Sequence, residues 1–156
     1  MSDKNLHTPH LRKQAGRDRR KIADVAVDFV EACDTGQGWT VCEQHCTEGA
    51  SFSAQCEELV EINDLETYCD WMQDLLKALP DAKLELRSVA VDEARNTISI
   101  YSVLTGRHLA EGGPVPPTGM KFTADYVYVI EFFGDRISHI TKVWNSAWTV
   151  RELGWA

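Results

Sequence analysis

Two apolar runs near the C-terminus decide the fold: FTADYVYVIEFF, residues 122–133, and RISHITKVW, residues 136–144. β-branched and aromatic residues fill both runs, which is typical of β-strands. Gly134 and Asp135 stand between them, and a Gly–Asp pair at such a junction indicates a tight turn. The stretch is therefore predicted to be a β-hairpin with two long strands.

The register of this hairpin determines which side chains share a face of the sheet. We expect a three-residue loop, 134–136, which places Tyr128 opposite Lys142. Two residues further from the loop, Tyr126 stands opposite Trp144. The four side chains then project from one face, with Cβ atoms about 4.5–5.5 Å apart within each pair. A two-residue loop would change the pairing, so the assignment depends on the loop length.

Helical periodicity dominates the first half of the chain. Apolar residues recur at helical spacing over 22–33, and a glycine-rich turn follows. A short second helix is expected over 39–46. The third is expected over 63–79, where Asn63 is the predicted N-cap and Glu66 stands three residues later, as in a capping box.

Strand periodicity replaces helical periodicity after the third helix. Residues alternate over 84–89 and in part over 97–104, a glycine- and proline-rich loop follows at 112–119, and a short strand is expected at 50–54. Helices followed by strands indicate the α+β class. We expect three N-terminal helices packed on a strongly curved antiparallel sheet, which together form a cone around an apolar pocket.

Length and composition limit the classes of protein. The chain has 156 residues, of which 44% are hydrophobic and 26% charged, as in an ordinary globular domain. No apolar run is long enough to cross a membrane, and the first residues lack the apolar core of a secretory signal. Five cysteines and no export signal indicate reduced thiols and a cytoplasmic protein.

Charge divides the chain into a basic arm, 1–20, and a single acidic domain, 21–156. The net charge is −8, although the first 21 residues hold seven bases and only two acids. The bases either pair with the acidic domain or tether the chain to nucleic acid. We do not expect nucleic acid or a membrane as a partner, because an acidic domain repels phosphates and no aromatic residue lies among the bases.

Four short motifs carry a family resemblance, in this order along the chain: Gly106-Arg107-His108, Pro116-Pro117-Thr118-Gly119, Gly134-Asp135-Arg136-Ile137 and Arg151-Glu152-Leu153-Gly154. With the predicted order of helices and strands, the chain resembles the nuclear transport factor 2-like superfamily, and within it the SnoaL-like polyketide cyclase group. The resemblance covers roughly residues 20–156. It implies a cone-shaped α+β barrel with a hydrophobic cavity, often a homodimer formed through the outer face of the sheet.

The resemblance also implies a chemistry. Cyclases of this group use an Asp on the last strand and a His on the preceding strand for acid/base work, without metal or cofactor. An ungapped alignment of the hairpin places Lys142 at the Asp position and Tyr128 at the His position. This chain therefore replaces both proton-transfer residues.

Lys142 and Tyr128 are the first candidate catalytic residues. An amine buried among aromatic rings has a lowered pKa, because desolvation disfavours its charged form. A neutral amine can act as a base or attack a carbonyl, and a neighbouring phenol can donate to a developing oxyanion. Alternatively, the Lys142 stem covers Trp144 and its ammonium group reaches solvent or an acid.

His45 and Asp125 are the other candidate catalytic residues. His45 belongs to the short helix that would cover the mouth of the cone, where an imidazole can transfer protons near neutral pH; the alternative is an imidazole held by a backbone carbonyl. Asp125 interrupts an apolar strand and so needs a partner. It is either a proton-transfer carboxylate or the acceptor of a structural hydrogen bond on the outer face.

Aromatic side chains are the expected ligand contacts. We assign ligand binding to Tyr126, Trp144, Tyr101, Trp71 and His108. Tyr and Trp bury large apolar areas and retain a polar group, and His108 stands beside a loop at the expected rim of the pocket. The alternative is that these residues only fill the core, an interface or a loop anchor.

Metal and cofactor sites are not expected. Cys42, His45 and Cys46 share a helix face, but zinc needs a fourth ligand, which Cys33, Cys56 or Cys69 would have to supply. Motifs of serine hydrolases, NTPases and dinucleotide-binding enzymes are absent from the sequence.

The sequence thus predicts a protein that binds an apolar or aromatic small molecule in a hydrophobic cavity. If it is an enzyme, we expect a cofactor-free cyclase, isomerase or dehydratase (a lyase) that acts by acid/base chemistry. The alternative is a non-catalytic ligand-binding or dimerisation module of the same fold.

Overall fold

The computed structural model describes residues 9–156, with side chains from residue 21 onward. In chain order the elements are α1 (Pro9–Asp34), α2 (Trp39–Cys42), the 3-10 helix η1 (Glu43–His45), β1 (Cys46–Ala54), α3 (Leu65–Ala78), β2 (Lys83–Asp92), β3 (Thr97–Arg107), β4 (Lys121–Phe133), β5 (Arg136–Trp144) and α4 (Ser146–Glu152). The α+β class is confirmed.

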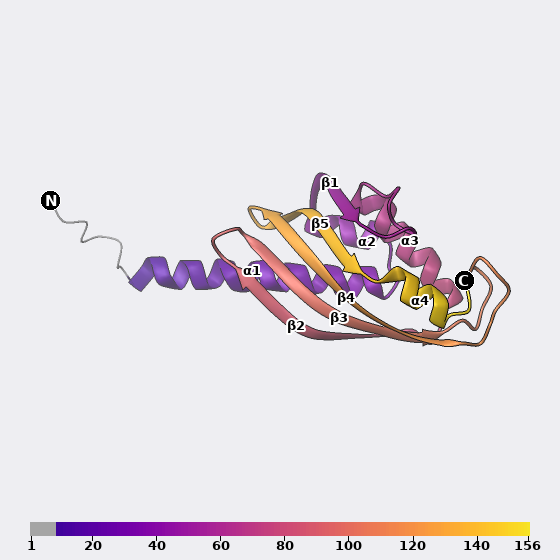
Figure 1. Cartoon of the computed structure of the whole chain (residues 1–156). Helices are drawn as coiled ribbons and strands as arrows, with labels where there is room; N and C mark the ends of the chain where they lie inside the picture. The colour runs from indigo at the N-terminus through magenta and orange to yellow at the C-terminus, as the bar shows by residue number, and fades with distance from the viewer. Residues whose placement is uncertain (1–8) are drawn as a thin grey trace.

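The five strands form one sheet in the order β1-β5-β4-β3-β2. Strands β2 to β5 form an antiparallel meander, whereas β1 pairs parallel with β5. The helix α1 runs along one face of the sheet, and its N-terminal turns extend past the end of the strands (Figure 1). Two predictions are therefore wrong, because the sheet is mixed and is not strongly curled.

The place of β1 in the chain explains the mixed sheet. Between β1 and β5 the chain passes through α3 and then crosses to the far edge at β2. A long connection of this kind permits a parallel neighbour, whereas a short turn enforces an antiparallel one. Because β1 adds a fifth strand at the edge and helices cover one face, the apolar side chains are buried without the sheet curling strongly.

The β4–β5 turn is shorter than predicted. Its loop has two residues, 134–135, and Phe133 pairs with Arg136. Gly134 has a φ of +62°, a conformation that glycine adopts without the strain of a Cβ atom. The predicted three-residue loop is therefore wrong.

A β-bulge nevertheless restores the predicted pairs. No residue of β4 is paired with Ser138 in the strand register, because the register shifts by one residue at this point. Beyond the bulge, Tyr128 pairs with Lys142 and Tyr126 pairs with Trp144, as predicted. The bulge compensates for the missing loop residue, so the same four side chains share a face.

Other boundaries differ from the sequence-based prediction. The second helix, predicted over 39–46, is α-helical only to Cys42 and continues as the 3-10 helix η1. The strand β1 starts at Cys46, which is earlier than the predicted strand at 50–54. Asp64, rather than Asn63, caps α3, because its side chain accepts a hydrogen bond from the Thr67 backbone N–H at 2.7 Å. The helix α4 was not predicted.

The predicted basic arm is described only in part. Residues 1–8 lie outside the described residues, and residues 9–20 are described as helical backbone within α1. Lys21, just after the arm, forms an exposed ion pair with Asp135 at 2.8 Å. Within the described part of the chain, no helix is long and apolar enough to cross a membrane.

Candidate active site

The C-terminal end of α1 places a carboxylate in the core. Asp34, the last residue of α1, is only 1% exposed. Tyr126 and Tyr128 of β4 donate hydrogen bonds to its two oxygens, Oδ2 and Oδ1, at 2.5 and 2.8 Å. Burial raises the pKa of Asp34, because the carboxylate loses its hydration, while Lys142 and the two phenols act in the opposite direction.

A third phenol connects this carboxylate to the lysine. Tyr68 of α3 is fully buried, and its ring stacks on Phe52 with centroids 4.1 Å apart. Its hydroxyl group forms a hydrogen bond with the Tyr128 hydroxyl group. The same oxygen accepts a hydrogen bond from Lys142 Nζ at 3.0 Å. The contacts therefore run without interruption from Lys142 to Asp34.

Lys142 is buried in an aromatic cage. Its side chain is 5% exposed, and Nζ lies 4.3 Å from the ring centroid of Trp144, 4.7 Å from that of Tyr126 and 5.3 Å from that of Tyr68. Burial lowers the pKa of Lys142 from 10.5 to about 8, and Asp34 opposes this change. Aromatic faces also stabilise an ammonium group. A substantial fraction of the amine is thus neutral near pH 8.

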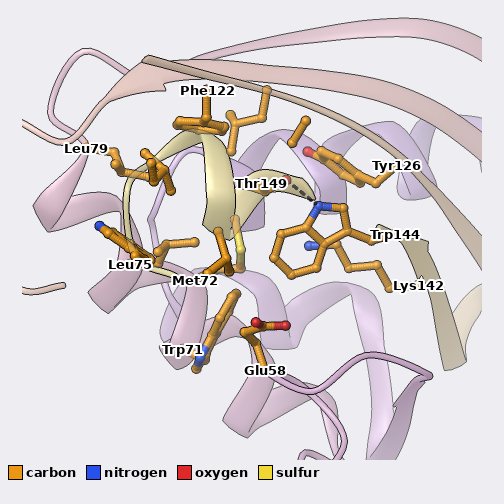
Figure 2. Close-up of a pocket in the computed structure, with 15 residues that line it drawn as sticks. Glu58, Trp71, Met72, Leu75, Leu79, Phe122, Tyr126, Lys142, Trp144 and Thr149 are labelled. Carbon is orange, nitrogen blue, oxygen red and sulfur yellow. Dashed lines mark hydrogen bonds between the residues drawn. The ribbon is translucent and has the colours of Figure 1, made fainter. Parts of the chain in front are cut away.

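Lys142 opens onto a narrow apolar cavity (Figure 2). Its walls are mostly hydrocarbon and aromatic; the lining residues are Glu58, Trp71, Met72, Leu75, Leu79, Leu104, Phe122, Ala124, Tyr126, Lys142, Trp144, Thr149, Val150, Leu153 and Trp155. About 40 Å³ is open to the centres of water molecules, which is room for a few waters. A larger ligand therefore requires side chains or the C-terminal segment to move.

Several predicted ligand contacts line this cavity. Figure 2 shows Trp71 and Trp144 on its walls, with the Trp144 indole N–H donating to Thr149 Oγ1 at 3.0 Å. Tyr126 also lines it, but Tyr128 does not. The single hydroxyl hydrogen of Tyr128 is directed at Asp34, which leaves none for the oxyanion contact that the sequence suggested.

His108 holds the C-terminal segment in place. It is fully buried, and its Nδ1 accepts hydrogen bonds from the Trp155 indole N–H at 2.9 Å and from the Thr118 backbone N–H at 3.3 Å. Thr118 Oγ1 donates to the Leu153 carbonyl at 2.6 Å. Leu153 and Trp155 line the cavity, whereas His108 does not. His108 therefore affects the cavity only through the C-terminal segment.

Three other predicted residues lie away from the cavity. Asp125 is exposed on the opposite face of the sheet, where it accepts a hydrogen bond from the Tyr101 hydroxyl group at 2.9 Å. These two residues border an open depression rather than the enclosed cavity. His45 ends η1 and does not line the cavity. The structure thus gathers Lys142, Tyr126, Trp144 and Trp71, but not these three.

The cysteines meet in a different combination from the one considered in the sequence. The sulfur atoms of Cys33, Cys42 and Cys69 lie within 4.8 Å of one another, and all three residues are fully buried. His45 and Cys46 are not part of this group. Three thiols are one ligand short of a structural zinc site.

Sequence reasoning missed two residues of the buried network, Asp34 and Tyr68. Asp34 continues the apolar stripe of its helix, since it stands four residues after Val30, and an acid at a helix C-terminus is electrostatically unfavourable. Both signals were available. Tyr68 lies within the helix predicted over 63–79, but no local pattern indicates that its hydroxyl group would meet Lys142.

Comparison with known proteins identifies the family. The model of the SnoaL-like polyketide cyclase family matches residues 23–153 of this chain. The chain belongs to the SnoaL-like polyketide cyclase family. The family resemblance inferred from the sequence is therefore confirmed, and so is the nuclear transport factor 2-like superfamily. A search of curated proteins finds no match.

Solved structures of other proteins share the fold. AclR, a candidate hydroxylase from Streptomyces galilaeus, is 19% identical, with a TM-score of 0.71 over 88% of this chain and 83% of that chain. A candidate SnoaL-like polyketide cyclase from Jannaschia sp. CCS1 is 13% identical, with a TM-score of 0.73 over 88% and 94%. IdmH, a candidate polyketide cyclase from Streptomyces antibioticus, is 18% identical, with a TM-score of 0.68 over 85% and 98%. At these identities the likeness shows the fold alone.

Proposed function

We propose that this SnoaL-like protein is a cofactor-free acid/base enzyme that enolises an apolar or aromatic carbonyl compound and so promotes its cyclisation or isomerisation. The observation that carries the proposal is the position of Lys142. Its amine lines the apolar cavity, is shielded from solvent, and has a pKa lowered to about 8. General bases work best when their pKa lies near the working pH.

The surroundings of Lys142 suit a proton transfer. A neutral amine takes a proton from the carbon next to the carbonyl group and becomes an ammonium group. The faces of Trp144 and Tyr126 then stabilise this cation, and the ammonium group returns the proton to another atom of the enolate. The apolar walls exclude water, which strengthens the attraction between the ammonium group and the enolate.

Ligand entry requires the cavity to widen. The C-terminal segment is the element we propose to move, because Leu153 and Trp155 form part of the wall and only a few hydrogen bonds attach them to Thr118 and His108. The expected homodimer stays a proposal that rests on the family resemblance, and the cytoplasmic location, expected from the cysteines, likewise stays a proposal.

A direct test uses 2-tetralone, a neutral aromatic ketone with acidic C–H groups beside the carbonyl. We expect the protein to accelerate exchange of those hydrogens with D₂O, measured by proton NMR. Lys142→Met should abolish the acceleration, and Tyr101→Phe, on the outer face, should retain it. A wild-type protein that binds 2-tetralone without accelerating exchange would refute the proposal.

A non-catalytic ligand-binding module is the second candidate. The aromatic cage favours it, because four rings surround Lys142 Nζ and stabilise the charged, unreactive form. In that case Lys142→Met retains ligand affinity, measured by calorimetry, and neither protein accelerates exchange.

A further inference from the structure

We propose that Asp34 stores the proton of Lys142, and that the hydroxyl groups of Tyr68 and Tyr128 carry the proton between them. The inference deepens the proposed function and rests on it. It assigns a role to a carboxylate that neither touches the cavity nor corresponds to the acid expected on the last strand of SnoaL-like cyclases.

The hydrogen bonds along this path have only one consistent direction. A phenol carries a single donor hydrogen. Tyr128 uses its hydrogen on the Asp34 carboxylate, so its oxygen accepts from Tyr68. Tyr68 thereby uses its own hydrogen, so its oxygen accepts from Lys142. Every link donates toward Asp34.

A short proton shift along this path balances without further reactants. The Lys142 ammonium group gives one proton to Tyr68, Tyr68 gives its hydroxyl hydrogen to Tyr128, and Tyr128 gives its own to Oδ1 of Asp34. Each phenol loses one hydrogen and gains one, so neither is left ionised. The net result is a neutral amine and a neutral carboxylic acid.

The burial of the path favours this exchange. Tyr68 and Tyr128 are both fully buried, and neither lines the cavity, so they lie behind its wall. Burial raises the pKa of both phenols well above 10, which is consistent with carriers that never ionise. Burial also raises the pKa of Asp34 and lowers that of Lys142, which brings the ion pair and the neutral pair closer in free energy.

The stored proton has a consequence for the reaction. With the proton on Asp34, Lys142 becomes a base without releasing a proton to water. After the amine takes a proton from the substrate, the ammonium group, the enolate and the neutral Asp34 together carry no net charge. A proton lost to water would leave an uncompensated buried anion, which is costly. The arrangement therefore suits reactions that move a proton within a neutral carbonyl compound.

The first experiment measures rates in the full-length protein. The probe is 2-tetralone with deuterium beside the carbonyl group, and loss of deuterium in water is followed by NMR. We expect Tyr128→Phe, which cuts the path, to slow the loss at least about 10-fold, because general acid–base effects are typically about 10²–10⁴-fold. Tyr126→Phe is the matched variant, because it removes a hydrogen bond to Asp34 but leaves the path intact, and it should slow the loss less.

The second experiment tests where the proton resides. The probe is 2-naphthol, which has the shape of the 2-tetralone enol. When its anion binds beside the Lys142 ammonium group, infrared difference spectra should show the carbonyl band of a protonated carboxylic acid. Asp34→Asn should remove that band, and Tyr126→Phe should retain it.

The outcomes separate this inference from the proposed function. If Lys142→Met exchanges as fast as the wild type, the proposed function fails. If Lys142→Met is inactive while Tyr128→Phe slows exchange no more than Tyr126→Phe, the proton path through the two tyrosines is refuted and the proposed function stands. If the carbonyl band of a protonated carboxylic acid is absent, Asp34 does not store the proton. Should Tyr128→Phe fail to fold, Tyr68→Phe cuts the same path at its other link and is judged by the same criteria.

Discussion

Exchange of the buried charges for neutral groups should reveal how strongly they depend on one another. Asp34→Asn leaves Lys142 without its acid, and Lys142→Met leaves the carboxylate without its cation. The double variant removes both charges, yet the asparagine oxygen can still accept a hydrogen bond from a tyrosine. We therefore expect each single variant to be less stable than the double variant.

The magnitude follows from the pKa of Lys142. A pKa of 10.5 in the unfolded chain and about 8 in the folded one corresponds to a cost of about 3 kcal/mol at pH 7. Without Asp34 the amine becomes neutral at pH 7, and that cost approaches about 5 kcal/mol. Asp34→Asn also weakens the hydrogen bonds from the tyrosines, so its free energy of unfolding should fall by about 2–4 kcal/mol. That of Lys142→Met should fall by about 3–5 kcal/mol.

The assay is urea unfolding at pH 7, followed by far-ultraviolet circular dichroism. Replacement of both partners of a buried ion pair is often neutral or stabilising. The double variant should therefore lie within about 1 kcal/mol of the wild type or above it, and the coupling free energy should be about 3 kcal/mol or more. If instead the losses of the single variants add up in the double variant, the two charges do not form a coupled pair.

Three further predictions concern pH, the tail and a helix cap. Between pH 8 and 10.5 the unfolded lysine holds a proton that folded Lys142 has released, so the stability of the wild type relative to Lys142→Met should rise by about 3 kcal/mol, measured by urea unfolding. Trp155→Ala removes the contact with His108 and should increase the binding of the apolar dye ANS, measured by fluorescence titration. Asp64→Ala should lose about 1 kcal/mol of stability in thermal unfolding, whereas Asn63→Ala should change little.

The sequence allowed the α+β class and the shared face of the hairpin to be predicted, because both depend on periodicity. The parallel pairing of β1 could not be predicted, since it depends on a connection that runs from residue 55 to residue 135. The loop length was wrong, and the pairing was right only because the bulge at Ser138 compensates. The residues of the turn do not indicate that a bulge follows at Ser138.

The part of the candidate site that lies on the hairpin could be predicted, whereas the part contributed by the helices could not. Lys142 was placed correctly among aromatic rings, because strand alternation determines which side chains share a face. Asp34 and Tyr68 reach it from two helices far away in the chain, and sequence periodicity gives only the buried face of each helix. His45 and Asp125 were judged by residue type, which does not indicate distance from a cavity.

The bulge at Ser138 lets the length of the turn vary without changing which side chains face the interior. The extra residue absorbs the difference between a two- and a three-residue loop before the strand reaches Lys142. Length changes at the tip can thus accumulate during evolution without turning the amine outward, provided that a compensating residue is gained or lost between the tip and Ile140. Related chains with different tip lengths should accordingly differ also in the number of residues at this point of β5.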